Sequence, residues 1–123
     1  MDWTFQADRP IYIQIKERIK VRIVSGAYAP GDRLPAVRDM ALEAEVNPNT
    51  MQKALSELER DGLLHTQRTS GRFVTEDGNM IQEVKLELAR TQIAAFLTLM
   101  AAMGYDARAA AELILAREKG EVK

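Results

Sequence analysis

Two short apolar patterns at helical spacing, separated by only a few residues, constrain the fold of this chain more than any other feature. The first pattern has apolar residues at positions 37, 40, 41 and 44, and the second has them at 51, 54, 55 and 58. Each follows the i, i+3, i+4, i+7 rule and therefore predicts a helix with one buried face. Two helices joined by so short a connection have the spacing of a helix-turn-helix.

The second of these helices carries clear start and stop signals. Asn47 is a good N-cap, and Pro48 suits the first helical position because proline has no N–H to lose there. Gly62 follows the last apolar position and is the usual residue just beyond a helix end.

The outward face of the same helix is polar. Asparagine and glutamine can form paired hydrogen bonds with adenine in the major groove, each worth about 1–3 kcal/mol of discrimination. Lysine can reach a phosphate or a guanine, and free N–H groups at a helix start add a phosphate site. The pattern is equally typical of a capped helix with a solvated face. The residues expected on this face or in the first turn are Asn47, Asn49, Thr50, Gln52, Lys53 and Ser56.

The flanking segments predict a third helix and a hairpin. Isoleucines at 11, 15, 19 and 23 recur every four residues, which is a helical stripe. After Gly62, "LLHTQ" and "RFVTE" are two short strands joined by "RTSG". Arg68 and Arg72 flank the tip, where arginine can follow a DNA backbone or enter a minor groove, or can belong to a solvated turn. Arg38, beside core residue Val37, can reach DNA or pair with a neighbouring carboxylate. The segment "WTF" near the start reads as an edge strand.

The composition changes after Asp77-Gly78, where two amphipathic helices are expected. Their apolar stripes exceed what a two-helix hairpin can cover, and a two-fold homodimer would cover the rest. Packing of this tail on the preceding residues is the alternative. We expect a mostly α fold with a small β-hairpin, divided into residues 1–76 and a helical hairpin at 77–123. The expected dimer interface comprises Ile81, Val84, Leu88, Ile93, Phe96, Leu97, Met100, Met103, Leu113 and Ile114.

Composition argues against several classes of function. The chain has 17 basic and 18 acidic residues, so charge offers no bulk signal for nucleic acid. With no cysteine and one histidine, it has no metal-binding cluster and no nucleophile–base pair, so we expect no catalytic site, cofactor or metal. His65 is expected to be structural or solvent-facing. No apolar run reaches the length of a membrane span, and the N-terminus is too polar for a signal peptide, so a cytoplasmic location is expected.

The combined pattern between residues 10 and 74 resembles the winged helix-turn-helix domain of the GntR family of bacterial transcription factors. The form "VNPNT" and the short helical tail are similar to the YtrA-type subfamily, in which the tail is a two-helix dimerisation element. The residues that carry the resemblance are Pro10-Ile11-Tyr12, Gln14-Ile15, Gly26, Pro30-Gly31-Asp32, Leu34-Pro35, Arg38, Asn47-Pro48-Asn49-Thr50, Lys53-Ala54, Leu58-Glu59, Gly62 and Gly71 with Phe73-Val74.

The resemblance implies a set of DNA contacts. Ala36 stands where the family often has a serine that touches phosphate, so that contact is expected to be missing. Thr69 replaces the first glycine of the usual wing tip, which leaves the conformation of the tip open. The implied DNA-binding residues are Arg38, Asn47, Asn49, Thr50, Gln52, Lys53, Arg68, Thr69, Ser70, Gly71 and Arg72.

These observations lead to a dimeric, sequence-specific regulator, most simply a repressor that binds an inverted-repeat operator. Removal of Arg72 is then expected to lower the salt dependence of binding by about one unit. A winged-helix module that docks a protein partner through its apolar tail is the second hypothesis. The tail leaves little room for an enclosed effector pocket, and the resemblance implies control of a neighbouring operon, often one for an ABC transporter.

Overall fold

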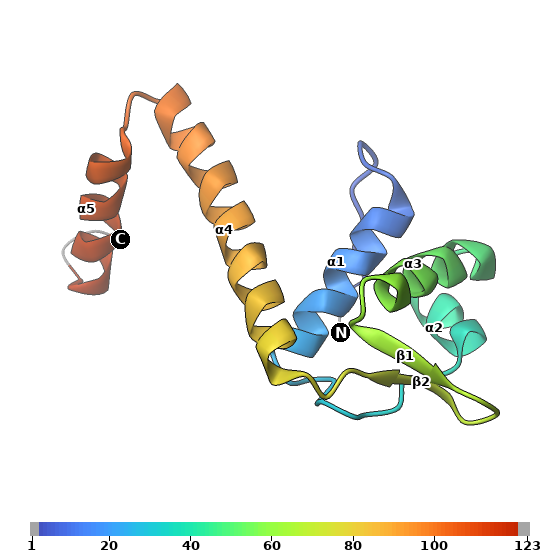
Figure 1. Ribbon diagram of the computed structural model, residues 1–123. Helices are drawn as coiled ribbons and strands as arrows, with labels where there is room; N and C mark the ends of the chain where they lie inside the picture. Colours follow the sequence, from blue (N-terminus) through green and yellow to red (C-terminus); the bar gives the residue numbers. More distant parts are fainter. Residues whose placement is uncertain (1–2, 121–123) are drawn as a thin grey trace. The chain divides into compact units, whose positions relative to one another are not determined.

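The computed structural model describes residues 3–120 and is mostly helical, with one two-stranded antiparallel sheet (Figure 1). This confirms the fold class expected from the sequence. The elements are α1 (Ile11–Val24), α2 (Val37–Ala44), α3 (Pro48–Arg60), β1 (Leu64–Gln67), β2 (Gly71–Val74), α4 (Gly78–Ala102) and α5 (Ala107–Glu118).

The chain divides into two compact units, residues 1–85 and residues 86–123. The first unit contains α1 to α3, the hairpin and the first turns of α4. Its core is formed where the apolar faces of the three helices meet the inner face of the hairpin. The largest fully buried side chains are Ile15, Ile19, Ile23, Met40, Met51, Leu55, Leu58, Leu63, Leu64 and Val74.

The ends of α3 follow the signals in the sequence. The side chain of Asn47 accepts a hydrogen bond of 2.8 Å from the backbone N–H of Asn49, with Pro48 at the first helical position. Beyond Arg60 the chain turns at Gly62, whose φ of 89° lies in the left-handed region that favours glycine. The helix that carries the polar face is therefore defined at both ends by local interactions.

The hairpin is held to the core at its open end. Leu64 lies opposite Val74 in the register of the two strands, and both side chains are buried. The connection before α2 lies along the outer side of β2, where the N–H of Leu34 donates to the carbonyl of Arg72 and the N–H of Val74 to the carbonyl of Asp32. The hairpin base is therefore fixed by both apolar packing and backbone hydrogen bonds.

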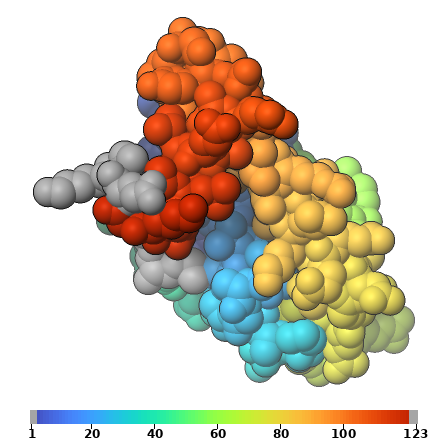
Figure 2. Space-filling model, turned by 90° about the vertical axis from the view of Figure 1, so that its left-hand side faces the viewer, coloured from blue at the N-terminus to red at the C-terminus, as the bar shows by residue number. Residues whose placement is uncertain are grey.

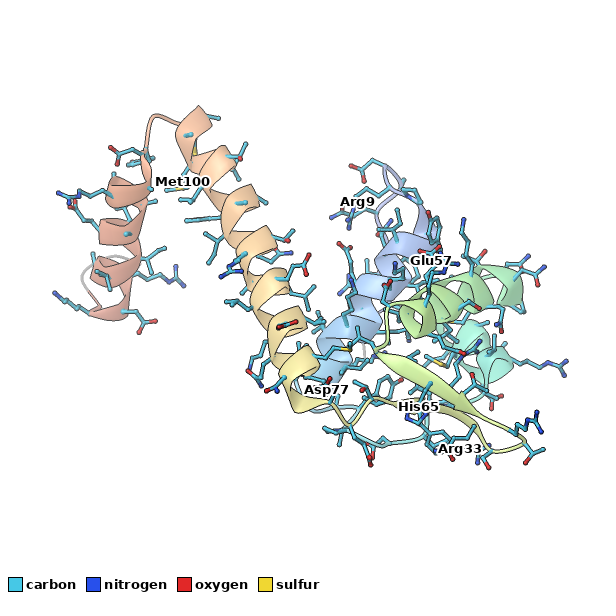
Figure 3. The ribbon with its side chains drawn as sticks, viewed as in Figure 1. Arg9, Arg33, Glu57, His65, Asp77 and Met100 are labelled. Atoms are coloured by element: carbon cyan, nitrogen blue, oxygen red, sulfur yellow. The ribbon has the colours of Figure 1, made fainter. Side chains whose placement is uncertain are left out.

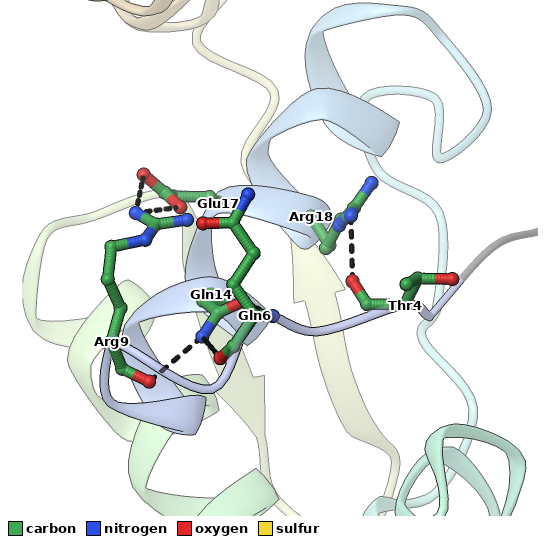
Figure 4. A network of polar contacts seen from close by, with 6 residues as sticks. All are labelled: Thr4, Gln6, Arg9, Gln14, Glu17 and Arg18. Carbon is green, nitrogen blue, oxygen red and sulfur yellow. Dashed lines mark hydrogen bonds and ion pairs between the residues drawn. The ribbon is translucent and has the colours of Figure 1, made fainter.

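The expected edge strand at "WTF" is wrong, because this segment is bound by side chains instead of by a neighbouring strand. The indole N–H of Trp3 donates to Glu43 (3.0 Å), and the guanidinium of buried Arg22 lies over the Trp3 ring. Further along, the side chain of Gln14 bonds both the N–H and the carbonyl of Gln6 (Figure 4). The two bonds from Gln14 pair the backbone N–H and carbonyl of Gln6, which a sheet would otherwise pair.

The first turns of α4 belong to the core of the first unit. The carboxylate of Asp77 accepts hydrogen bonds from the N–H groups of Asn79 and Met80, which caps the start of the helix. Ile81 is then buried, and Val84 packs against the same core. Both residues are also predicted for a dimer interface; within one chain, Ile81 is already buried in the core and Val84 is half-buried against it.

The second unit contains the rest of α4 together with α5. The chain leaves α4 through Gly104, with a φ of 94°, and Asp106 caps α5 by accepting from the N–H of Ala109. Side chains of α4 (yellow to orange) and α5 (red) reach the surface in the view of Figure 2. Within residues 3–120, no single helix has both the length and the apolar character needed to cross a membrane.

Candidate DNA-binding surface

The exposed face of α3 forms the centre of the candidate site. Met51, Ala54, Leu55 and Leu58 are buried, as their spacing predicts, and this orients the opposite face toward solvent. The polar residues on that exposed side are Asn47, Asn49, Gln52 and Lys53, with Thr50 and Ser56 half-buried beside them.

Two of the outward side chains are already held by contacts within the protein. The amide nitrogen of Gln52 donates to the hydroxyl of Ser56, one turn along α3, at 3.0 Å. An amide nitrogen has two protons, so Gln52 keeps one donor and its carbonyl oxygen, which is the set needed to pair with adenine. The ammonium of Lys53 lies 3.8 Å from the centre of the Tyr12 ring of α1, a cation–π geometry.

Arg38 extends from the exposed side of α2. Among residues 3–120 its guanidinium has neither a hydrogen-bond nor an ion-pair partner, so the pairing with Asp39 or Glu45 that the sequence allowed is not formed. An exposed arginine without an internal partner keeps all five of its donors available for an anion or a base edge.

The tip of the hairpin is a three-residue loop between Gln67 and Gly71. Arg68, Thr69 and Ser70 are all exposed, and the N–H of Ser70 donates to the carbonyl of Gln67. Thr69 adopts the left-handed conformation, with a φ of 60°, and so takes the geometry that a glycine would otherwise provide.

Arg72 differs from Arg68, the other arginine of the wing, because its side chain bonds another residue of the protein. Its Nε donates to the carboxylate of Glu59 on α3 at 3.0 Å, and only 17% of its side chain is exposed. The hydroxyl of Thr66 donates to the same carboxylate oxygen at 2.8 Å. The bonds from Thr66 and Arg72 lower the pKa of Glu59, so this carboxylate is ionised at neutral pH.

The arrangement of three helices and a wing agrees with the protein family whose pattern the sequence matches. The model of the family described as "Bacterial regulatory proteins, gntR family" matches residues 11–74, more than half of the chain. The chain belongs to the GntR family. The matched range contains the three helices and the wing, so this protein is a winged helix-turn-helix transcription regulator.

Two curated relatives extend the similarity beyond the GntR domain. The HTH-type transcriptional regulator YhcF of Bacillus subtilis (strain 168) is 42% identical over 104 residues, which cover 85% of this chain and 86% of YhcF. The HTH-type transcriptional repressor YtrA of the same organism is 37% identical over 89 residues, covering 72% of this chain and 68% of YtrA.

Solved structures show the same relationship. A GntR family transcriptional regulator from Listeria monocytogenes superimposes with a TM-score of 0.81 at 36% identity, over 94% of this chain and 98% of that one. AraR(DBD), solved in complex with operator ORX1, superimposes with a TM-score of 0.55 at 30% identity, over 58% of this chain and 93% of that one.

Several residues that surround the α3 surface of this GntR protein were not among those predicted from the sequence. Arg33, labelled in Figure 3, forms an isolated bridge with Phe73, and its guanidinium lies close to Gly71, where a Cβ would meet Nε at 3.0 Å. Two open grooves adjoin Arg72, with volumes of about 280 and 390 Å³. The alternation of side chains along β1 could have identified Thr66, since it shares a face with Leu64. No signal in the sequence pairs Glu59 with Arg72.

His65 lies on the other face of the hairpin. Its ring stacks against Phe73 with centroids 6.0 Å apart, and the residue is exposed. Within residues 3–120 no three acidic or histidine side chains gather in a way that could hold a metal ion.

Proposed function

We propose that this GntR protein is a homodimeric repressor that acts in the cytoplasm and binds an inverted-repeat operator through α3 and the wing. The observation that carries the proposal is the polar face of α3, which is exposed in a fold shared with AraR(DBD), a domain solved with operator DNA. The names of YtrA and of the Geobacillus stearothermophilus arabinose metabolism repressor favour repression as the mode of action.

The geometry supports a division of labour among the proposed contacts. Asn49 and Gln52 are suited to adenine edges in the major groove, and Arg38 to a guanine or a phosphate. Lys53 would leave the Tyr12 ring to reach DNA, which costs about 0.5–1 kcal/mol for an exposed cation–π contact. Asn47, Thr50 and the N–H groups of the first turn would hold a phosphate. The wing residues Arg68, Thr69, Ser70 and Gly71 would lie against the neighbouring groove or backbone.

The apolar side chains of the second unit support the homodimer. Ile93, Phe96 and Leu99 are between 40% and 63% exposed, and several other large apolar residues of α4 and α5 are exposed with them. Apolar patches of this kind mark interaction sites on soluble proteins. A two-fold axis would cover the same patch on both copies. Two α3 helices about 34 Å apart, one turn of DNA, would read the two halves of an inverted repeat. The residues proposed for this interface are Leu88, Ile93, Phe96, Leu97, Met100, Met103, Leu113 and Ile114.

Selection of bound duplexes from a random DNA pool at physiological salt, followed by sequencing, tests the proposal. We expect enrichment of an inverted repeat, whose two halves would report two copies of α3. Failure of the folded protein to enrich any sequence would favour the other hypothesis, a winged-helix module that binds a protein partner.

Arg38→Ala then tests whether DNA binds at the proposed surface beside α2 and α3. We expect it to weaken binding to the selected operator by about 1–3 kcal/mol if the contact is to a base. Arg108→Ala is the matched control, because Arg108 is an exposed arginine of α5. Equal affinity of both variants in a fluorescence anisotropy titration would place the DNA elsewhere on the protein.

A further inference from the structure

The wing has a polar contact with α3 beyond the point where the apolar core ends. Leu64 and Val74 are opposite each other in the hairpin and are buried in the core. Two residues further along each strand, Thr66 and Arg72 are also opposite each other. Side chains two residues apart lie on the same face of a strand, so this second pair continues the inner face of the hairpin toward its tip.

Both members of this pair bind one oxygen atom of α3. The Thr66 hydroxyl donates to Oε1 of Glu59 at 2.8 Å, and Nε of Arg72 donates to the same oxygen at 3.0 Å. A single carboxylate therefore joins both strands of the wing to the recognition helix. The loop beyond this contact, residues 68–70, is exposed, so the contact lies between the buried base of the hairpin and its exposed tip.

The geometry points to Glu59 as the positioning residue of the DNA-binding surface, with Arg72 acting through Glu59 instead of as a phosphate ligand. This inference rests on the proposed DNA-binding function. The inference explains why an acidic residue, Glu59, lies beside the proposed DNA-binding surface. An unpaired carboxylate there would repel the phosphates of DNA. The lowered pKa of Glu59, caused by its bonds to Thr66 and Arg72, agrees with a carboxylate that stays ionised and paired.

The two roles of Arg72 predict opposite results for Glu59→Gln. If Glu59 positions the wing, the variant loosens the wing and weakens operator binding. We expect a loss of about tenfold, which corresponds to about 1.4 kcal/mol for the bonds that join Thr66 and Arg72 to Glu59. If Glu59 merely neutralises a phosphate-binding arginine, its removal frees Arg72, eliminates a negative charge and tightens binding. Weaker or tighter operator binding by Glu59→Gln therefore distinguishes the two roles of Arg72.

The DNA experiment measures affinity for the selected operator against salt concentration. We expect Glu59→Gln and Arg72→Gln to weaken binding by similar factors, the double variant to lose no more than either single variant, and all salt slopes to match the parent. Tighter binding by Glu59→Gln, or a slope lowered by about one unit in Arg72→Gln, would overturn the inference.

A second experiment needs no DNA and so separates this inference from the proposed function. Amide hydrogen exchange of the free protein should be faster at residues 66–72 in Glu59→Gln. Glu57→Gln is the matched control, because Glu57 lies on the same helix but bonds Lys16 of α1 at 3.0 Å. Unchanged exchange in the wing of Glu59→Gln would overturn the positioning role whether or not the parent protein selects an operator.

Discussion

Thr69 shows how one residue departs from the preference of its position. A φ of 60° places a β-branched side chain in a region that favours glycine or asparagine. The conformation is imposed by the three-residue loop, whose ends are fixed by pairing of Gln67 with Gly71. The threonine at the tip is visible in the sequence, but the conformation that the loop imposes on it is not.

Thr69→Asn should therefore stabilise the protein by about 1 kcal/mol, because asparagine tolerates the left-handed region at lower cost. Urea unfolding followed by circular dichroism measures the change. Ser70→Asn is the control, since Ser70 has no positive φ and should show no such gain. Equal gains in both variants would mean that strain at Thr69 is not the cause.

At the scale of elements, α3 connects the other parts of the first unit. Glu57 and Glu59 are two residues apart and so point to opposite sides of the helix. Glu57, labelled in Figure 3, bonds Lys16 on α1, and Glu59 bonds Arg72 of the wing. The apolar spacing of α3 was sufficient to predict which residues are buried. It could not predict these ion pairs, because their partners come from distant parts of the chain.

The start of α3 combines a structural role with a proposed DNA contact at Asn47. Asn47→Ala removes the cap on Asn49 and should destabilise the protein by about 1 kcal/mol, whereas Asn47→Ser retains a capping oxygen and should cost little. Unfolding in urea measures both. If Asn47 also binds DNA through its amide, the serine variant will lose operator affinity while it keeps its stability. An alanine variant as stable as the parent would contradict the capping role.

The ion pair of Glu59 also predicts a dependence of stability on pH. Its bonds to Thr66 and Arg72 lower the pKa in the folded state below the unfolded value of about 4.3. The resulting stabilisation is present above the unfolded pKa and is lost as the pH falls through the folded pKa. Between about pH 6 and pH 3, the parent should therefore lose more free energy of unfolding than Glu59→Gln. Glu83→Gln, at an exposed position of α4, serves as the control and should follow the parent. If the free energy of unfolding of the parent and of Glu59→Gln changed equally with pH, the ion pair of Glu59 would not be the cause.

At the scale of the whole molecule, the exposed apolar residues of α4 and α5 determine the proposed assembly. Phe96→Glu places a charge in the centre of the proposed interface and should yield a monomer in sedimentation equilibrium. Operator binding should weaken in parallel, because each monomer would hold one half-site. Gln82→Glu adds the same charge at an exposed position of the first unit and should remain dimeric. A dimeric Phe96→Glu protein would place the interface elsewhere.

The amino-acid sequence by itself determined the helices, the hairpin, the cap at Asn47 and the membership of the GntR family. These features depend on the spacing of residues that are close together in the sequence, so the sequence is sufficient to predict them. Only the tertiary structure decided that Ile81 completes the core and that Arg72 is bonded to a carboxylate 13 residues away on another element. The physical reason is that a charged or apolar side chain binds whatever the fold brings within reach, and spacing along the chain does not encode that proximity.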